Sequence, residues 1–172
     1  MSSRTKRTPA ATQKKKEEEL STDLYEQPGH LIRRAHQISV SMFHEVLGPD
    51  ITPIQYAALR ILQDHPDIDQ VTLAKYCALD NSTTANLAVR LGEKGLVERV
   101  TPPENKRVRL LRLSTEGAAL LESLVPSVHE LRHRMLQTLT LDEQETFLAL
   151  LSKFVHINNE KSRAPLRRQQ IA

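Results

Sequence analysis

The stretch TLAKYCALDNSTTANLAVRLGEKGLVERVTPPENKRVRLLRLSTEGAAL, residues 72–120, decides the fold of this chain. It overlaps a short segment, residues 69–78, whose apolar spacing predicts a helix that turns four side chains inward: Val71, Leu73, Ala74 and Cys77. The polar cluster at residues 80–82 is typical of a helix N-terminus, and the helix that it begins is expected to continue to about Lys94. Gly95 follows, at the point where a left-handed residue commonly ends a helix. Two helices joined by a short turn predict a helix-turn-helix.

Two β-like segments follow this helix-turn-helix. Residues 96–100 and 107–113 are rich in Val and Leu, and they flank a turn of sequence TPPENK at residues 101–106. The polar sequence at residues 114–116 then caps a further long helix. A helix-turn-helix followed by a hairpin predicts a winged helix-turn-helix domain over residues 51–114. The predicted fold class is therefore mainly α with a small β-hairpin wing.

Apolar residues at helical spacing extend on both sides of the winged domain. We expect residues 24–50 and 115–160 to form a helical dimerisation region, in which each protomer completes its apolar core against its partner. The alternative is a helical bundle within a monomer. Residues 1–23 and 161–172 are polar and basic, which predicts a disordered basic tail before the domain and a flexible basic tail after it.

Composition narrows the possible functions. Apolar residues make up 39% of the 172 residues, which suits a chain that completes its core by dimerising. Aromatic residues make up 3%, too few for recognition of single strands by base stacking. No phosphate-binding glycine loop, nucleophile motif or catalytic carboxylate pair is apparent, so we expect neither enzyme activity nor a cofactor. No secretory or membrane-spanning run is apparent either, and we expect a cytoplasmic protein without membrane contact.

The second helix of the helix-turn-helix has the side chains that reading a major groove requires. Short polar residues must lie on its exposed face, because base edges are deep in the groove. Ser82, Asn86 and Arg90 lie on one stripe at i, i+4 and i+8, with Thr83 alongside. Leu87, Ala88 and Leu91 occupy the opposite face. The alternative is an ordinary amphipathic surface helix, which the neighbouring wing disfavours.

The wing carries three further candidate DNA contacts, Lys106, Arg107 and Arg109, with other arginines nearby. The formal net charge is only +3, so binding to DNA would depend on where basic residues lie and not on their sum. A basic wing tip beside a polar recognition helix predicts contacts to double-stranded DNA.

These motifs together resemble the MarR family of transcription regulators. The resemblance covers residues 28–160 and rests on the turn into the recognition helix, on RLGEKGLVER, on a Pro-rich wing tip that ends in NKR, and on LSTEG. It implies a homodimer that binds a pseudo-palindromic operator, and a small-molecule pocket between the first, second and long helices. Arg107 matches the arginine that the family commonly inserts into the minor groove. The family usually has an acidic residue two positions before that arginine, and this chain has Asn105 there.

Basic and polar residues near the start of the first helix indicate what that pocket would bind. The sequence PGHLIRRAHQ places His30, Arg33, Arg34 and Gln37 close together at a helix N-terminus, which suits a carboxylate or another anion. Tyr56 on the second helix could pack against an aromatic ring. The start PGHLIRR also resembles family members that control aromatic-acid breakdown, of the nicotinate or hydroxycinnamate type. The alternative is a solvated basic face with ion pairs between subunits.

Two other features have a structural explanation that we prefer. His129 and His133 have a spacing that can chelate zinc, but no third ligand is apparent, so we expect no metal site. Cys77 is expected to be a packing residue and not a redox switch.

The sequence as a whole predicts a dimeric DNA-binding regulator, a repressor released by a small aromatic or acyl anionic effector. A protein–protein adaptor and a ligand-free architectural DNA-binding protein are the alternatives. The operator, the regulated genes, the effector and the direction of regulation stay open.

Overall fold

The computed structural model describes residues 23–102 and 109–167, and contacts divide the chain into two compact units, Met1–Ser39 and Val40–Ala172. The first unit holds the short helix η1 (Leu24–Glu26) and the start of α2 (Pro28–Leu47). Asp23 caps η1 by accepting a hydrogen bond from the Tyr25 N–H at 2.9 Å. The rest of the N-terminal tail proposed above lies outside the described residues.

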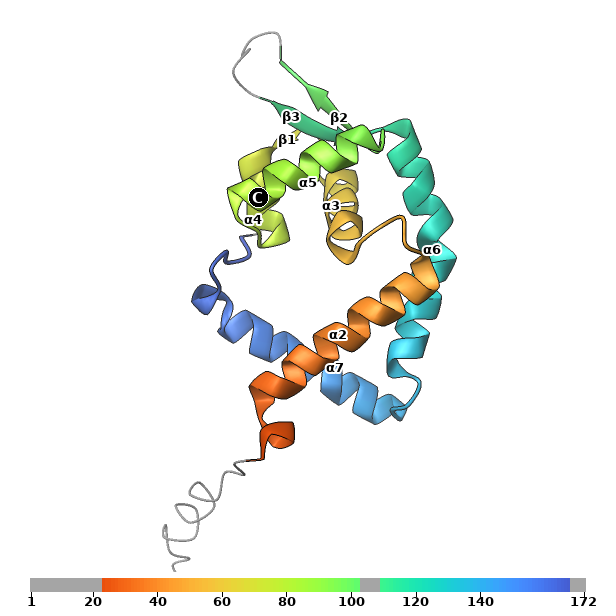
Figure 1. Cartoon of the computed structure of the whole chain (residues 1–172), viewed down its shortest axis with the longest axis vertical. Coiled ribbons are helices and arrows are strands. Elements are labelled where there is room, and N and C mark those ends of the chain that lie inside the picture. The colour runs from red at the N-terminus through yellow and green to blue at the C-terminus, as the bar shows by residue number, and fades with distance from the viewer. Residues whose placement is uncertain (1–22, 103–108, 168–172) are drawn as a thin grey trace, which may run out of the picture. The chain divides into compact units, whose positions relative to one another are not determined.

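The second unit contains the winged helix-turn-helix (Figure 1). The second unit begins within α2. After α2 it contains α3 (Pro53–Asp64), β1 (Ile68–Asp69), α4 (Gln70–Cys77), α5 (Asn81–Glu93), β2 (Val97–Val100), β3 (Leu110–Leu113), α6 (Thr115–Leu136), α7 (Leu141–Ile157) and η2 (Asn159–Lys161). Mainly helical secondary structure with one small antiparallel sheet confirms the predicted fold class.

Local capping sets most of these helix boundaries. Thr52 and Gln55 form a reciprocal capping box at the start of α3, with hydrogen bonds of 3.3 and 3.1 Å. Thr140 and Glu143 form the same motif at the start of α7. Gly95 has a φ of +71°, the left-handed conformation expected just after α5.

The sheet has three strands, one more than the predicted hairpin. β3 lies in the centre and pairs antiparallel with both neighbours, with Leu111 opposite Ile68 of β1 and Arg99 of β2. The sequence did not reveal β1, because two residues are too few to show an alternating pattern. Arg112 fixes this edge through a bidentate ion pair with Asp67, whose hydrogen bonds measure 2.8 and 2.7 Å.

The core of the winged domain is built from leucines of four elements. The largest fully buried apolar side chains are Leu59, Leu62, Leu73, Leu91 and Leu111, from α3, α4, α5 and β3. Two of the four side chains predicted to face inward from α4, Leu73 and Ala74, are buried, and Cys77 is partly buried. Val71 is 48% exposed, so its predicted inward position is wrong, because it lies at the edge of the apolar stripe of a helix of only two turns.

The wing joins α6 through one tight junction. The Ser114 hydroxyl donates to the Gly95 carbonyl at 2.6 Å and accepts from the Gly117 N–H at 2.9 Å. The Ser114 N–H donates to the Leu96 carbonyl at 3.1 Å. A Cβ at position 117 would overlap that Leu96 carbonyl oxygen and come within 2.9 Å of Leu113 Cδ1. Only glycine lets α6 start this close to the end of α5.

The C-terminal end of the described chain has defined hydrogen bonds. Residues 161–167, which the sequence assigned to a flexible tail, include the end of η2 and a segment that pairs with Asn159 and with the backbone of α4. Residues 168–172, the rest of that predicted tail, lie outside the described residues, and flexibility of the tail stays a prediction.

We expect Gly117→Ala to lower the free energy of unfolding by about 1–3 kcal/mol, because the added methyl group meets backbone and not a side chain that could move away. Thermal or urea unfolding at a fixed protein concentration measures the change. Gly92→Ala is the matched control: its Cβ would have its nearest neighbour, the Val97 carbonyl oxygen, at 3.8 Å, and alanine favours a helix over glycine by about 1 kcal/mol. Equal stability of the two variants would contradict the tight junction.

Candidate nucleic-acid interface

A residue in the left-handed conformation and a capping carboxylate define the turn between α4 and α5. Ala78 adopts a left-handed conformation, with a φ of 53°, and ends α4. Asp80 caps α5 by accepting a hydrogen bond from the Thr83 N–H at 2.8 Å. The turn is therefore three residues long, which is the spacing of a helix-turn-helix.

One face of α5 belongs to the core. Thr84, Leu87, Ala88 and Leu91 are buried, and the Thr84 hydroxyl bonds to the Asp80 carbonyl at 2.9 Å. The opposite face holds the four residues predicted to contact DNA, all of them exposed: Ser82, Thr83, Asn86 and Arg90. The structure thus has the polar stripe on the outward side, as the spacing predicted.

The four side chains differ in which of their hydrogen-bonding groups are still available to bind DNA. Within the part of the chain that the structure describes, the side chains of Asn86 and Arg90 have no hydrogen-bond or ion-pair partner. The Thr83 hydroxyl donates its proton to the Asp80 carboxylate at 2.7 Å. Thr83 can therefore accept a hydrogen bond from a base but has no proton left for a phosphate oxygen.

Val89 is an exposed residue of α5 that sequence analysis missed. It is 43% exposed and follows Asn86 by one helical turn. An apolar side chain on this face can contact the methyl group of thymine, which is a base-specific feature of the major groove. Its exposure could not be read from the sequence, because valine at this spacing fits the buried face equally well.

Asp80 places a negative charge at the N-terminus of α5. The hydrogen bond from the Thr83 N–H lowers the pKa of this carboxyl below its ordinary value, so it is ionised at neutral pH. The lowered pKa means that the cap stabilises the fold above the unfolded pKa of about 3.9, and that this stabilisation is lost as the pH falls through the folded value. A helix N-terminus otherwise attracts phosphate, and the carboxylate opposes that attraction.

The described part of the wing shows two arginines in structural roles. Arg109 donates a hydrogen bond to the Thr101 hydroxyl across the base of the hairpin. Arg112 is held by Asp67, as described above, and both side chains are near 40% exposed. The other two predicted wing contacts, Lys106 and Arg107, lie outside the described residues, as does Asn105.

The predicted effector residues fall into two groups. In the first unit, Arg33 and Arg34 both donate to the side-chain oxygen of Gln37, at 2.9 and 3.4 Å, and the ring of His30 lies edge-on to Tyr25 with centroids 5.5 Å apart. In the second unit, Tyr56 packs its ring edge-on against Phe43, with centroids 6.2 Å apart.

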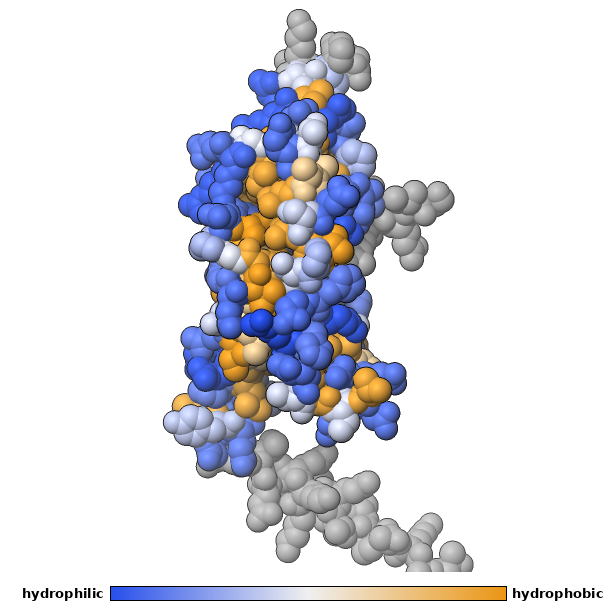
Figure 2. All heavy atoms as spheres, turned by 90° about the vertical axis from the view of Figure 1, so that its right-hand side faces the viewer, coloured by the Kyte–Doolittle hydropathy of each residue, from blue (hydrophilic) through white to orange (hydrophobic). Residues whose placement is uncertain are grey.

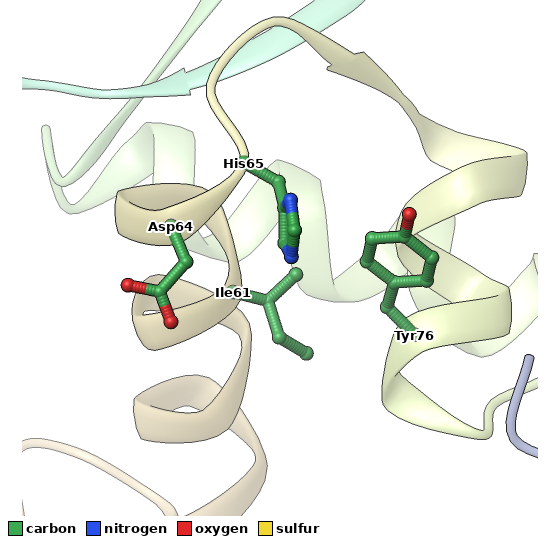
Figure 3. A pocket seen from close by; sticks show the side chains of 4 residues that line it. All are labelled: Ile61, Asp64, His65 and Tyr76. Atoms are coloured by element: carbon green, nitrogen blue, oxygen red, sulfur yellow. The ribbon is translucent and has the colours of Figure 1, made fainter. Parts of the chain in front are cut away.

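A surface cavity of about 210 Å³ lies between the end of α3 and α4 (Figure 3). The rings of His65 and Tyr76 are in edge contact, with centroids 5.0 Å apart, and both line the cavity together with Ile61 and Asp64. No sequence motif indicated this cavity.

Neither metal binding nor thiol chemistry gains support from the described residues. A second surface cavity includes His129 and His133, but Arg132 lines the same cavity and would repel a cation. No group of three or more potential metal ligands lies within residues 23–102 and 109–167. Burial raises the pKa of the Cys77 thiol to about 11, which favours packing over reactivity.

Comparison with known proteins agrees with this geometry. The MarR family model matches residues 51–108. The chain is 32% identical over 134 residues to the HTH-type transcriptional repressor NicR of Pseudomonas putida, a match that covers 77% of this chain and 85% of that protein.

Two solved structures extend the likeness to the fold. BpsR of Bordetella bronchiseptica, whose structure concerns regulation of its DNA binding by 6-hydroxynicotinic acid, aligns with a TM-score of 0.72 and 29% identity, covering 78% of this chain and 97% of BpsR. A mutant of MarR from Escherichia coli, complexed with operator DNA, aligns with a TM-score of 0.69 and 34% identity, covering 74% of this chain and 92% of that one.

The fold and the exposed polar helix define a winged-helix DNA-binding protein. The chain belongs to the MarR family, and it is a DNA-binding transcription regulator and not an enzyme. Among the helices that the structure describes, none combines the length and the apolar character needed to cross a membrane.

Asp80→Asn tests the charge at the tip of α5. Asparagine also caps helices well, so α5 is retained while a charge that repels phosphate is removed. We expect binding to random duplex DNA to tighten roughly two- to tenfold at low salt, with a smaller change at high salt. Fluorescence anisotropy over a salt series measures this. Asp142→Asn, which removes a carboxylate from the first turn of α7, is the matched control and should leave binding unchanged. If the two variants bind alike, the N-terminus of α5 does not approach phosphates.

Proposed function

We propose that the protein is a homodimeric repressor that binds a pseudo-palindromic operator and leaves it when a small aromatic carboxylate binds. The observation that carries the proposal is the outward face of α5, where Asn86 and Arg90 are exposed and unengaged on a helix fixed from behind by four buried residues. Asparagine can pair with adenine through two hydrogen bonds, and arginine can reach guanine or phosphate. Ser82, Thr83 and the wing residues Lys106, Arg107 and Arg109 complete the proposed DNA contacts.

Dimerisation is supported by the surface of α7. None of its 17 residues is buried, yet it carries an apolar set exposed by 36–61%: Phe147, Leu148, Leu150, Leu151, Phe154 and Val155. Contiguous apolar surface of this kind marks a protein–protein interface. Figure 2, which shows the side where α6 lies, has an apolar band bordered by hydrophilic side chains. A second copy of the chain would cover such surfaces and place two recognition helices on successive turns of the operator.

The effector proposal is supported by the cationic pair in the first unit. Arg33 and Arg34 converge on the Gln37 side-chain oxygen, which keeps two guanidinium groups close together despite their like charge. A carboxylate is a stronger acceptor than an amide oxygen and could take the place of Gln37. His30 is the other proposed contact of the effector in the first unit, and the contact of Tyr56, in the second unit, stays a separate prediction. The regulation of BpsR by 6-hydroxynicotinic acid favours an aromatic acid as its chemical class.

Asn86→Ala and Arg90→Ala test the DNA-binding face. Loss of Asn86 should reduce discrimination between the operator and a single-base variant by about 1–3 kcal/mol, the range for a two-hydrogen-bond base contact. Loss of Arg90, if it contacts phosphate, should weaken operator and random DNA equally and lower the salt slope by about one unit. Competition binding with both duplexes gives both quantities. The same pattern for both variants would contradict these separate roles.

Arg34→Ala tests the effector site. In the unaltered protein, 6-hydroxynicotinic acid should weaken operator binding about 5–150-fold, the usual range of allosteric coupling, and the corresponding amide should not. Arg34→Ala should bind the operator normally and lose the response. Arg60→Ala is the matched control, because Arg60 likewise bonds to a glutamine on its own helix, and it should keep the response. A response that survives Arg34→Ala would mean that the effector binds elsewhere.

A further inference from the structure

The last described residues of the chain leave α7 and return to α4. Figure 1 shows this segment, in blue, running from the end of α7 to the helix-turn-helix. It comprises η2 and the residues up to Arg167, and both ends of its path lie in the second unit. We call residues 158–167 the strap.

Asn159 closes the strap on itself. Its side-chain nitrogen donates to the Leu166 carbonyl at 3.2 Å, and its side-chain oxygen accepts from the Leu166 N–H at 2.8 Å. One amide thus satisfies both backbone groups of Leu166, as a neighbouring strand would. An aspartate could make only the second of these bonds, and an alanine neither.

Glu160 and Arg167 fix the end of the strap. The two side chains form a bidentate pair with both hydrogen bonds at 2.7 Å. Their side chains are 64% and 56% exposed, so the pair adds little to global stability. Its effect is to neutralise Arg167 and to orient the backbone at that residue.

The strap ends on a backbone group that α4 leaves open. The Ala78 and Leu79 N–H groups both donate to the Ala74 carbonyl, which leaves the next carbonyl, that of Lys75, without its helical partner. The Arg167 N–H donates to this Lys75 carbonyl at 3.0 Å. The strap therefore satisfies one of the carbonyls at the C-terminal end of α4.

We propose that the strap positions the helix-turn-helix relative to α7 and thereby increases affinity for DNA. Only three residues separate the last turn of α4 from the first turn of α5, so a contact that holds the former also restrains the latter. A restrained recognition helix loses less conformational entropy when it enters the groove. This proposal rests on the DNA-binding function and goes beyond it, since no strap residue needs to contact DNA.

The competing explanation is direct attraction between the basic C-terminal residues and phosphate. The pairing of Arg167 with Glu160 argues against it for that residue. The two explanations differ in salt dependence, because a phosphate contact contributes to the salt slope and a positioning contact does not.

Asn159→Ala in the full-length protein tests the strap, with Asn158→Ala as its matched control. Among the described residues, the Asn158 side chain bonds only to the Phe154 carbonyl of α7, so its loss removes none of the side-chain hydrogen bonds that hold the strap to α4 or close it on itself. Hydrogen exchange without DNA should be faster in Asn159→Ala at the amides of the α4–α5 turn and the first turn of α5. Operator binding should weaken roughly two- to tenfold, as for loss of one or two hydrogen bonds, with an unchanged salt slope. Asn158→Ala should change neither quantity.

Three results would contradict the proposed role of the strap. Unchanged exchange in Asn159→Ala would show that the strap does not restrain the turn, and this result needs no DNA, so it is separate from a failure of the proposed function. Tighter operator binding would mean that the strap inhibits, and a lower salt slope would mean a phosphate contact. Glu160→Gln, which keeps the side-chain shape but weakens the pair, should show a smaller effect in the same direction. A thermal melt of each variant separates these effects from global unfolding.

Discussion

The carbonyl of Leu96 is the point on which the arrangement of the DNA-binding unit depends. It accepts the Ser114 N–H, and its oxygen lies so close to Gly117 that no side chain fits between them. The end of α5, the base of the wing and the first turn of α6 are thereby joined within a few ångströms. The hydrogen bond and the close approach both act on the segment that joins α5 to the wing, so α6 begins in direct contact with the end of the recognition helix. The fold thus supplies a close-packed connection between the recognition helix and the long helix beside it.

Local chemistry made much of this fold predictable. The Thr52–Gln55 and Thr140–Glu143 motifs, and Gly95 after α5, each specify a helix end through residues close in sequence. Features that depend on distant partners were not predictable. The strand β1 exists because Leu111 lies beside Ile68, and Arg112 pairs with Asp67 across 45 positions of sequence.

In the candidate site, too, features set by local sequence were predictable, and features that depend on hydrogen-bond partners were not. Helical spacing identified the outward face of α5, because four buried positions fix the opposite face. Spacing could not show which side chains on that face are already engaged, and Thr83 turned out to be bonded to Asp80 while Asn86 is not. Polar composition predicts a flexible C-terminal segment, but it cannot reveal that the Asn159 side chain bonds to the backbone of Leu166.

The state of Cys77 has a practical consequence for spectroscopy. It is the single cysteine of the chain and is partly buried, with a pKa of about 11. At pH 7 only roughly one thiol in ten thousand is therefore ionised, and maleimides and other alkylating probes react with the ionised form. A cysteine introduced at an exposed position has an ordinary pKa and would be labelled far faster. Fluorophores or spin labels can thus be attached to the protein at chosen positions while its own cysteine stays in place.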